Sequence, residues 1–341
     1  MRTIRAGVAV ICCACAMVRA GGQQPASSGA TGTQVIRVWG YSGLSAQLLL
    51  WEAEYRNLHP EVRFENQLHG ANAVMAGLYN GVADFALMGR EIWPVDTMAY
   101  QWVYQQQPFG VIVATAGFHA PGQLFTPVVI VNGRNPLASI TLSQLDAIYG
   151  SEHRVAPANI RTWGELGVKG AWADKPIHPY GFAGEDALGV FFRHDVLRSD
   201  FKPNPDSHLL SDHDSATVSA AGRIAQAVAA DPYAVGYTSM PHGPMTKTLV
   251  VASPSPIAPS EETLSNHQYA LTRSVWLYFR RAPEKPIDPK VDGFVRFLLS
   301  PKAQALVRPS DELLPLTPEL VQKQVEKLDK PMPKSAIAEE N

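Results

Sequence analysis

The sequence predicts an α/β fold in which parallel strands are covered by helices, and three observations lead to this prediction. Short runs of β-branched and aromatic residues alternate with longer segments whose apolar residues recur every three or four positions. The chain has 341 residues, a length typical of about two domains. Apolar residues make up 46% of it and charged residues 18%, which excludes a disordered or collagen-like chain.

Secondary structure is expected to begin at Val35 and to alternate regularly from there. Strands are predicted at 35–39, 62–64 and 84–88, and helices at 44–58 and 74–80. The first helix carries its apolar residues on one face, and Pro60 ends it. Gly81 follows the second helix as a C-cap glycine would. This alternation predicts a parallel sheet with covering helices.

The rest of the chain continues the pattern without an internal repeat. Strands are predicted at 128–131, 177–180, 234–238 and 275–280, and helices at 142–150, 191–196, 217–230 and 289–299. Thr141 and Gln144 form a capping box at the start of the first of these helices. Pro289 follows Asp288 at the start of the last helix, where a proline at the first helical position is favoured.

The first twenty residues have the layout of a secretory signal peptide. Arg2 and Arg5 precede a short apolar run at 6–18, and a small-residue cleavage site ends at Ala20. The alternative, a buried N-terminal strand or helix, fits this layout less well. We therefore expect a periplasmic or secreted protein, cleaved near Ala20, with a flexible tether at 21–34.

Cysteine usage and charge narrow the function further. Cys12, Cys13 and Cys15 all lie in the signal, so the mature chain has no thiol for a disulfide, a nucleophile or a metal. Lipid attachment at one of them is an alternative, although the preceding residues fit a lipid-attachment box poorly. Cleavage removes three of 29 basic residues and no acid, which leaves 26 basic against 31 acidic residues. This balance argues against a nucleic-acid partner, and no apolar run is long enough to span a membrane.

Motifs for catalysis, metals and cofactors are absent from the sequence. The segment from Gly40 to Leu44 lacks the final glycine of a nucleophile elbow, and no phosphate loop or dinucleotide fingerprint is present. Residues 212–214, an Asp-His-Asp run, are expected to be a solvated polar loop rather than a metal site. Glu185 and Asp186 are expected at a helix N-terminus rather than in an acid/base pair. We therefore expect no enzyme, no cofactor and no metal.

Ordered segments across the mature chain resemble the phosphate-binding proteins of ABC transporters. Two of these segments are Gly81 to Glu91, with the sequence GVADFALMGRE, and Tyr269 to Arg273, with the sequence YALTR. Four more segments follow in that family's order: LSQL at 142–145, IYG at 148–150, WGELG at 163–167 and AVGY at 234–237. No single segment is decisive, but their succession is specific for the superfamily of type II periplasmic binding proteins.

The resemblance implies two α/β lobes with a mixed sheet each, flanking helices, two hinge crossovers and a ligand cleft between the lobes. Lobe one would comprise 35–118 and 250–320, lobe two 119–249, and a C-terminal helix or tail 321–341. The family's anion site lies on strand-to-helix turns, whose backbone N–H groups and Ser, Thr and Arg side chains bind the ligand. In this chain the resemblance implies the following ligand-binding residues: Tyr41, Ser42, Gly43, Leu44, Ala71, Asn72, Gly89, Arg90, Phe182, Glu185, Asp186 and Ala187.

Several of these positions depart from the family's pattern. An arginine of the fourth turn is replaced by Phe182, and its serine by Asp186. Arg90 is the cationic residue that the resemblance retains. Because a carboxylate repels an anion, tight phosphate binding is not assured, and a neutral or cationic ligand is an alternative.

Two functions remain open from the sequence. The first is an exported solute-binding protein that binds a small molecule or anion in the cleft and delivers it to an ABC transporter permease. The second is a degenerate binding module, a sensor or a partner-binding protein without a tight small ligand. An enzyme is the least favoured interpretation.

Overall fold

The computed structural model describes residues 34–120, 122–199, 202–240, 242–307 and 312–332. The expected signal peptide, its three cysteines, the tether up to residue 33 and the tail beyond Met332 lie outside these residues. In the described part of the chain, no helix is long and apolar enough to cross a membrane.

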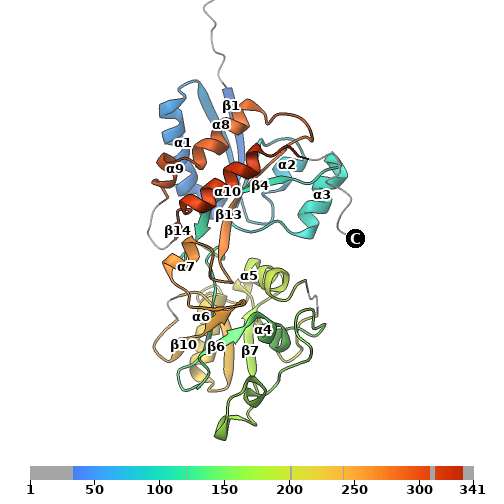
Figure 1. Ribbon diagram of the computed structural model, residues 1–341, viewed down its shortest axis with the longest axis vertical. Helices are drawn as coiled ribbons and strands as arrows, with labels where there is room; N and C mark the ends of the chain where they lie inside the picture. Colours follow the sequence, from blue (N-terminus) through green and yellow to red (C-terminus); the bar gives the residue numbers. More distant parts are fainter. Residues whose placement is uncertain (1–33, 121, 200–201, 241, 308–311, 333–341) are drawn as a thin grey trace, which may run out of the picture. The chain divides into compact units, whose positions relative to one another are not determined.

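A six-stranded mixed sheet combines the first third of the described chain with its C-terminal part. Its order is β14-β4-β13-β3-β1-β2. The strands are β1 (Gln34–Tyr41), β2 (Val62–His69), β3 (Phe85–Met88), β4 (Phe109–Ala116), β13 (Arg273–Phe279) and β14 (Leu313–Leu314). β1 runs parallel to β2 and β3, whereas β13 pairs antiparallel with β3 and β4. Figure 1 shows the orange β13 beside strands drawn in blue and cyan.

A five-stranded mixed sheet is built from the middle of the chain, in the order β10-β5-β9-β7-β8. Its strands are β5 (Val128–Asn132), β7 (His178–Phe182), β8 (His208–Leu210), β9 (Ala234–Thr238) and β10 (Thr246–Thr248). β7 is parallel to both β8 and β9, so these three strands end at the same edge. The lobe boundaries at 119 and 249 stay a prediction.

A third sheet was not expected from the sequence. It contains β6 (Ser139–Thr141), β11 (Val250–Ala252) and β12 (Pro256–Ile257) in the order β12-β11-β6. Strands of two or three residues carry too short a pattern for period-two alternation to be recognised.

Ten α-helices are found among the described residues. They are α1 (Ser45–Leu58), α2 (Ala76–Tyr79), α3 (Pro94–Tyr104), α4 (Leu142–Tyr149), α5 (Ala187–Phe191), α6 (Ala220–Ala230), α7 (Glu261–Ser265), α8 (Pro289–Leu298), α9 (Pro301–Gln304) and α10 (Pro318–Asp329). α5 continues as a turn of π-helix over Phe192–Val196. The predicted capping box at Thr141 and Gln144 is confirmed, with both reciprocal hydrogen bonds formed.

The helices differ in how they pack against the hydrophobic core. α1 and α8 bury one apolar face each, and the ring of Phe294 on α8 packs against Tyr55, Phe64 and Phe85. By contrast α3 exposes Val95, Met98, Trp102 and Val103. The outer face of α3 is therefore as apolar as its inner face.

One buried acid makes the stability of the fold depend on pH. Glu52 on α1 is almost fully buried, and its Oε1 atom has no hydrogen-bond partner among the described residues. Burial raises the pKa of Glu52 to about 7. A hydrogen bond from Asn66 lowers this pKa, but its effect is smaller than that of burial. The folded protein therefore keeps a proton that the unfolded chain releases at lower pH, so stability falls as pH rises through this interval.

Replacing Glu52 with glutamine should remove this loss. Above about pH 7 we expect the variant to gain roughly 2–3 kcal/mol in the free energy of unfolding relative to the parent chain. Urea unfolding at about pH 5 and about pH 8 measures the difference, and Glu326→Gln on the exposed face of α10 is the matched control. Equal pH slopes for the Glu52 variant and the parent would contradict the assignment.

Candidate functional site

A cavity lies at the carboxyl edge of the parallel strands β7, β8 and β9. Phe182 ends β7, Asp212 lies two residues beyond β8, and Ser239 follows β9 directly. All three line a cavity of about 220 Å³. We call it the carboxyl-end cavity. Ligands of open α/β sheets bind outside the carboxyl ends of parallel strands, which makes this position the candidate site.

The remaining walls come from the crossover before β5 and from the start of α6. Phe118, Phe125 and Gln123 line the cavity from the crossover, and Ser219 lines it as the N-cap residue of α6. The Phe125 ring lies 6.3 Å from that of Phe182, centroid to centroid. The backbone N–H of Phe182 donates to Tyr237 Oη at 3.1 Å, which fixes the end of β7. The walls therefore combine polar and apolar surface in similar amounts.

Polar side chains of the chain itself cap the two helices that begin here. The Ala220 N–H of α6 donates to Asp212 Oδ1 at 2.7 Å. The Leu188 N–H of α5 donates to Gln123 Oε1 at 3.2 Å. Gln123 Nε2 in turn donates to Asp212 Oδ2 at 2.7 Å. The N–H groups of Ala220 and Leu188 at these helix N-termini thus already have oxygen partners.

A second carboxylate stands beside Asp212. Asp186 is the N-cap residue of α5, it is buried, and its Oδ2 has no hydrogen-bond partner among the described residues. Burial raises the pKa of Asp186, hydrogen bonds from Gln123 and Ser211 lower it, and the charge of Asp212 raises it again. The surroundings of the cavity are therefore acidic.

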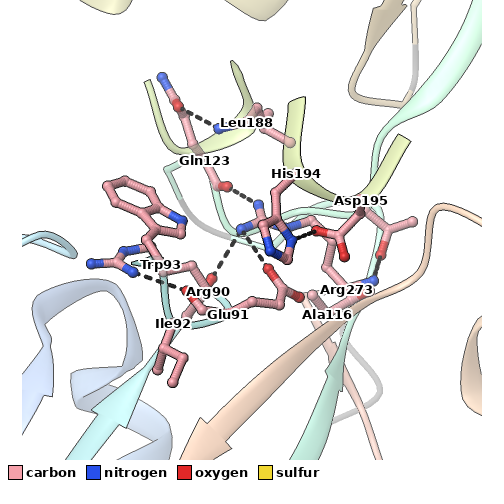
Figure 2. A network of polar contacts seen from close by, with 12 residues as sticks. Arg90, Glu91, Ile92, Trp93, Ala116, Gln123, Leu188, His194, Asp195 and Arg273 are labelled. Atoms are coloured by element: carbon pink, nitrogen blue, oxygen red, sulfur yellow. Dashed lines mark hydrogen bonds and ion pairs between the residues drawn. The ribbon is translucent and has the colours of Figure 1, made fainter. Parts of the chain in front are cut away.

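Arg273, at the start of β13, is the centre of a polar network that Figure 2 shows. Its fully buried guanidinium donates to the Gln123 carbonyl and, at 3.4 Å, to the Gly89 carbonyl. It also forms an ion pair with Glu91 at 3.8 Å. Burial raises the pKa of Glu91, although Arg273 opposes that shift. We call these four residues the arginine network; it anchors the backbone of Gln123.

His194 and Asp195 on the π-helical turn lie next to this network (Figure 2). Their side chains are 3.5 Å apart, from Nδ1 to Oδ2. A hydrogen bond to Asp195 raises the pKa of His194. The charge of Asp195 contributes to the raised pKa of Glu91. These residues were not expected to belong to the site.

Arg90, which the resemblance places among the ligand-binding residues, is paired with an acid of the chain itself. Its guanidinium is buried and bonds both carboxylate oxygens of Asp96, at 2.7 and 3.3 Å. It also lies 3.6 Å from the centroid of the Trp93 ring. Asp96 additionally accepts the Trp93 N–H at the start of α3, at 2.9 Å. The change Arg90→Ala would therefore destabilise the fold, because it would leave a buried carboxylate without its cation.

Tyr41 and two of the glycines predicted for the site do come together. A Cβ atom on Gly43 or on Gly89 would lie 2.5 or 2.9 Å from the Tyr41 ring. A Cβ atom on Gly122, in the crossover, would lie 2.4 Å from Tyr41 Oη. The backbone of Gly122 also has a positive φ, of +62°. The close approach of the Tyr41 ring thus requires glycine at these positions.

The other predicted residues differ in burial and in position within their elements. Ser42 and Asn72 are exposed, Leu44 belongs to the core, and Ala71 follows β2. Glu185 is exposed, whereas Ala187 is the first residue of α5. Of the predicted set, Phe182 lines the carboxyl-end cavity. Their role as ligand-binding residues stays a prediction.

Sequence reasoning missed Gln123, Arg273, Asp212 and Ser239. Arg273 closes the YALTR segment, which carried the resemblance without a role for the arginine. Asp212 belongs to the run that we expected to be solvated; that expectation is wrong for Asp212, which bonds Gln123 and caps α6. Among the described residues no group of His, Cys, Asp and Glu is placed to hold a metal ion.

Two larger hollows lie elsewhere. One of about 320 Å³ is lined by Arg37, Asp84 and Arg280, and one of about 530 Å³ by Arg161, His178 and His208. Asp84 directly precedes β3, while His178 and His208 begin β7 and β8, so these hollows lie at the amino ends of parallel strands. The carboxyl-end rule therefore favours the smaller cavity.

The chain matches one protein-family model and is similar to two phosphate-binding proteins. A family model described as PBP superfamily domain matches residues 25–302. The phosphate-binding protein PstS of Pseudomonas aeruginosa, strain PAO1, is 26% identical over 295 residues, which are 85% of either chain. The protein of strain UCBPP-PA14 matches equally.

Solved structures share the fold. PstS from Borrelia burgdorferi superposes with a TM-score of 0.58 at 17% identity, over 83% of this chain and 99% of that one. An ABC-type phosphate transport receptor from Vibrio cholerae gives a TM-score of 0.55 at 19% identity, over 82% and 99%. The predicted fold, that of a type II periplasmic binding protein with mixed sheets, is thereby confirmed.

Proposed function

Because the chain belongs to the PBP superfamily, we propose that it is an exported solute-binding protein that delivers a small ligand to an ABC transporter permease. The ligand binds at the carboxyl-end cavity. The protein acts as a receptor and not as an enzyme. The transport role is proposed from the names of the relatives, which are phosphate-binding proteins and a phosphate transport receptor.

The observation that carries the proposal is the convergence of distant segments on one cavity. The crossover, the ends of β7, β8 and β9 and the start of α6 all contribute side chains to it. Its volume of about 220 Å³ lies below the ~300–1,000 Å³ of pockets for drug-sized ligands, so the solute is small. A module without a small ligand is not favoured, because such a cavity supports a ligand.

Thermal unfolding of the full chain with a panel of small solutes tests this proposal. The panel comprises phosphate, sulfate, amino acids, monosaccharides and small amines, each matched in ionic strength to a salt control. We expect one class to raise the melting temperature by several degrees, since a ligand at about 100 times its Kd adds about 2.7 kcal/mol. No shift with any class would contradict a solute-binding function.

A further inference from the structure

We propose that the carboxyl-end cavity selects a small organic cation and rejects oxyanions. The inference rests on the proposed function and names the class of its ligand. It follows from three features of the cavity: its described walls contain no lysine or arginine, side chains of the chain already cap N–H groups at two helix N-termini, and a carboxylate and three aromatic rings line the same space.

The first feature is the charge of the walls. The described residues that line the cavity include Asp212 and His119 but no lysine or arginine. Arg273 contacts the carbonyl of Gln123, yet its charge is paired with Glu91. Arg90 is likewise paired with Asp96. An oxyanion in the cavity would meet a carboxylate without an unpaired arginine to offset the repulsion.

The second feature is the use of the helix N-termini. Asp212 accepts the N–H of Ala220, and Gln123 accepts that of Leu188. Ser219, the N-cap residue of α6, accepts the N–H of Gly222 at 3.2 Å. An oxyanion would have to displace these oxygens before it reached the backbone donors. The carboxylate of Asp212 thus occupies the place that an anionic ligand would take at α6.

The third feature is what the cavity offers a cation. Each carboxylate oxygen has about two acceptor sites, so Asp212 can accept further hydrogen bonds beyond those from Ala220 and Gln123. Phe118, Phe125 and Phe182 line the same space, and aromatic rings attract ammonium groups. Asp186, buried beside Asp212, adds a second acid to the surroundings. Carboxylate and rings together match a small ammonium compound.

Choline and its neutral isostere 3,3-dimethylbutan-1-ol separate charge from shape. We expect calorimetric titration of the full chain to give a Kd for choline at least about tenfold below that of the isostere. Phosphate should bind more weakly than choline. Asp212→Asn, which keeps hydrogen-bonding groups but removes the charge, should weaken choline binding by about tenfold and leave the isostere unaffected. Asp174→Asn, at an exposed acid outside the cavity, should change neither.

Equal affinities for choline and its isostere, or tighter binding of phosphate than of choline, would overturn the inference. These comparisons of choline with its isostere and with phosphate use the unaltered chain. They therefore remain valid even if the Asp212→Asn variant unfolds because α6 has lost its cap. Binding of phosphate or of a neutral solute, with neither choline nor a small amine bound, would leave the solute-binding function standing and remove only the cationic ligand class. No binding of any solute in the panel would refute both.

Discussion

Replacing Arg273 with methionine is expected to lower the free energy of unfolding by about 3–5 kcal/mol, the usual cost of breaking a buried ion pair on one side. Arg273 is fully buried and bonds two carbonyls, those of Gln123 and Gly89. The variant would leave Glu91 without its cation. Since a protonated Glu91 needs no cation, the loss should be greater at about pH 8 than at about pH 5. Urea unfolding at both pH values measures it.

Arg280→Met is the matched control, because Arg280 follows the same strand but is exposed. Its side chain lies over the Tyr104 ring at 4.5 Å, and exposed contacts of this kind contribute about 0.5–1 kcal/mol. Similar losses for the two variants would show that the arginine network does not hold the crossover in place.

Arg90→Met should have a comparable effect, again about 3–5 kcal/mol, because it leaves the buried Asp96 unpaired. The second change Asp96→Asn should restore part of this loss, since the uncompensated charge disappears. A double-mutant cycle over the two positions, followed by urea unfolding, measures the coupling.

The exposed pair of Arg63 and Glu65 provides the control cycle, with side chains 64% and 49% exposed. Its coupling should stay below about 1 kcal/mol. A loss of under about 1 kcal/mol for Arg90→Met would instead fit the ligand-binding arginine that the resemblance implies.

Much of the fold followed from the sequence because its signals are local. Strands with β-branched runs, such as β9, and helices with one apolar face, such as α8, are recognisable from spacing alone. Gly150 and Pro60 marked helix ends through backbone geometry. Neither α3 nor the three-stranded sheet was predicted; the strands of that sheet contain only two or three residues, too few for a pattern to be recognised.

The site was less predictable because its partners are distant in the sequence. Gln123 meets Asp212 across 89 positions, and the Arg273 side chain reaches the Gln123 carbonyl across 150. Neither spacing carries a pattern that a local motif could reveal. Phe182, inferred from the resemblance, lines the cavity, and Tyr41 lies close to Gly89 because strand ends converge by topology; their role in ligand binding stays a prediction.

Two tryptophan substitutions test most directly whether a small solute binds in the carboxyl-end cavity. Ser239→Trp fills that cavity, whereas Ser207→Trp fills the hollow lined by Arg161 and His178. The solute that stabilises the parent chain against heat should stabilise the Ser207 variant equally and the Ser239 variant not at all. Stabilisation that survives in the Ser239 variant and disappears in the Ser207 variant would contradict the assignment of the site.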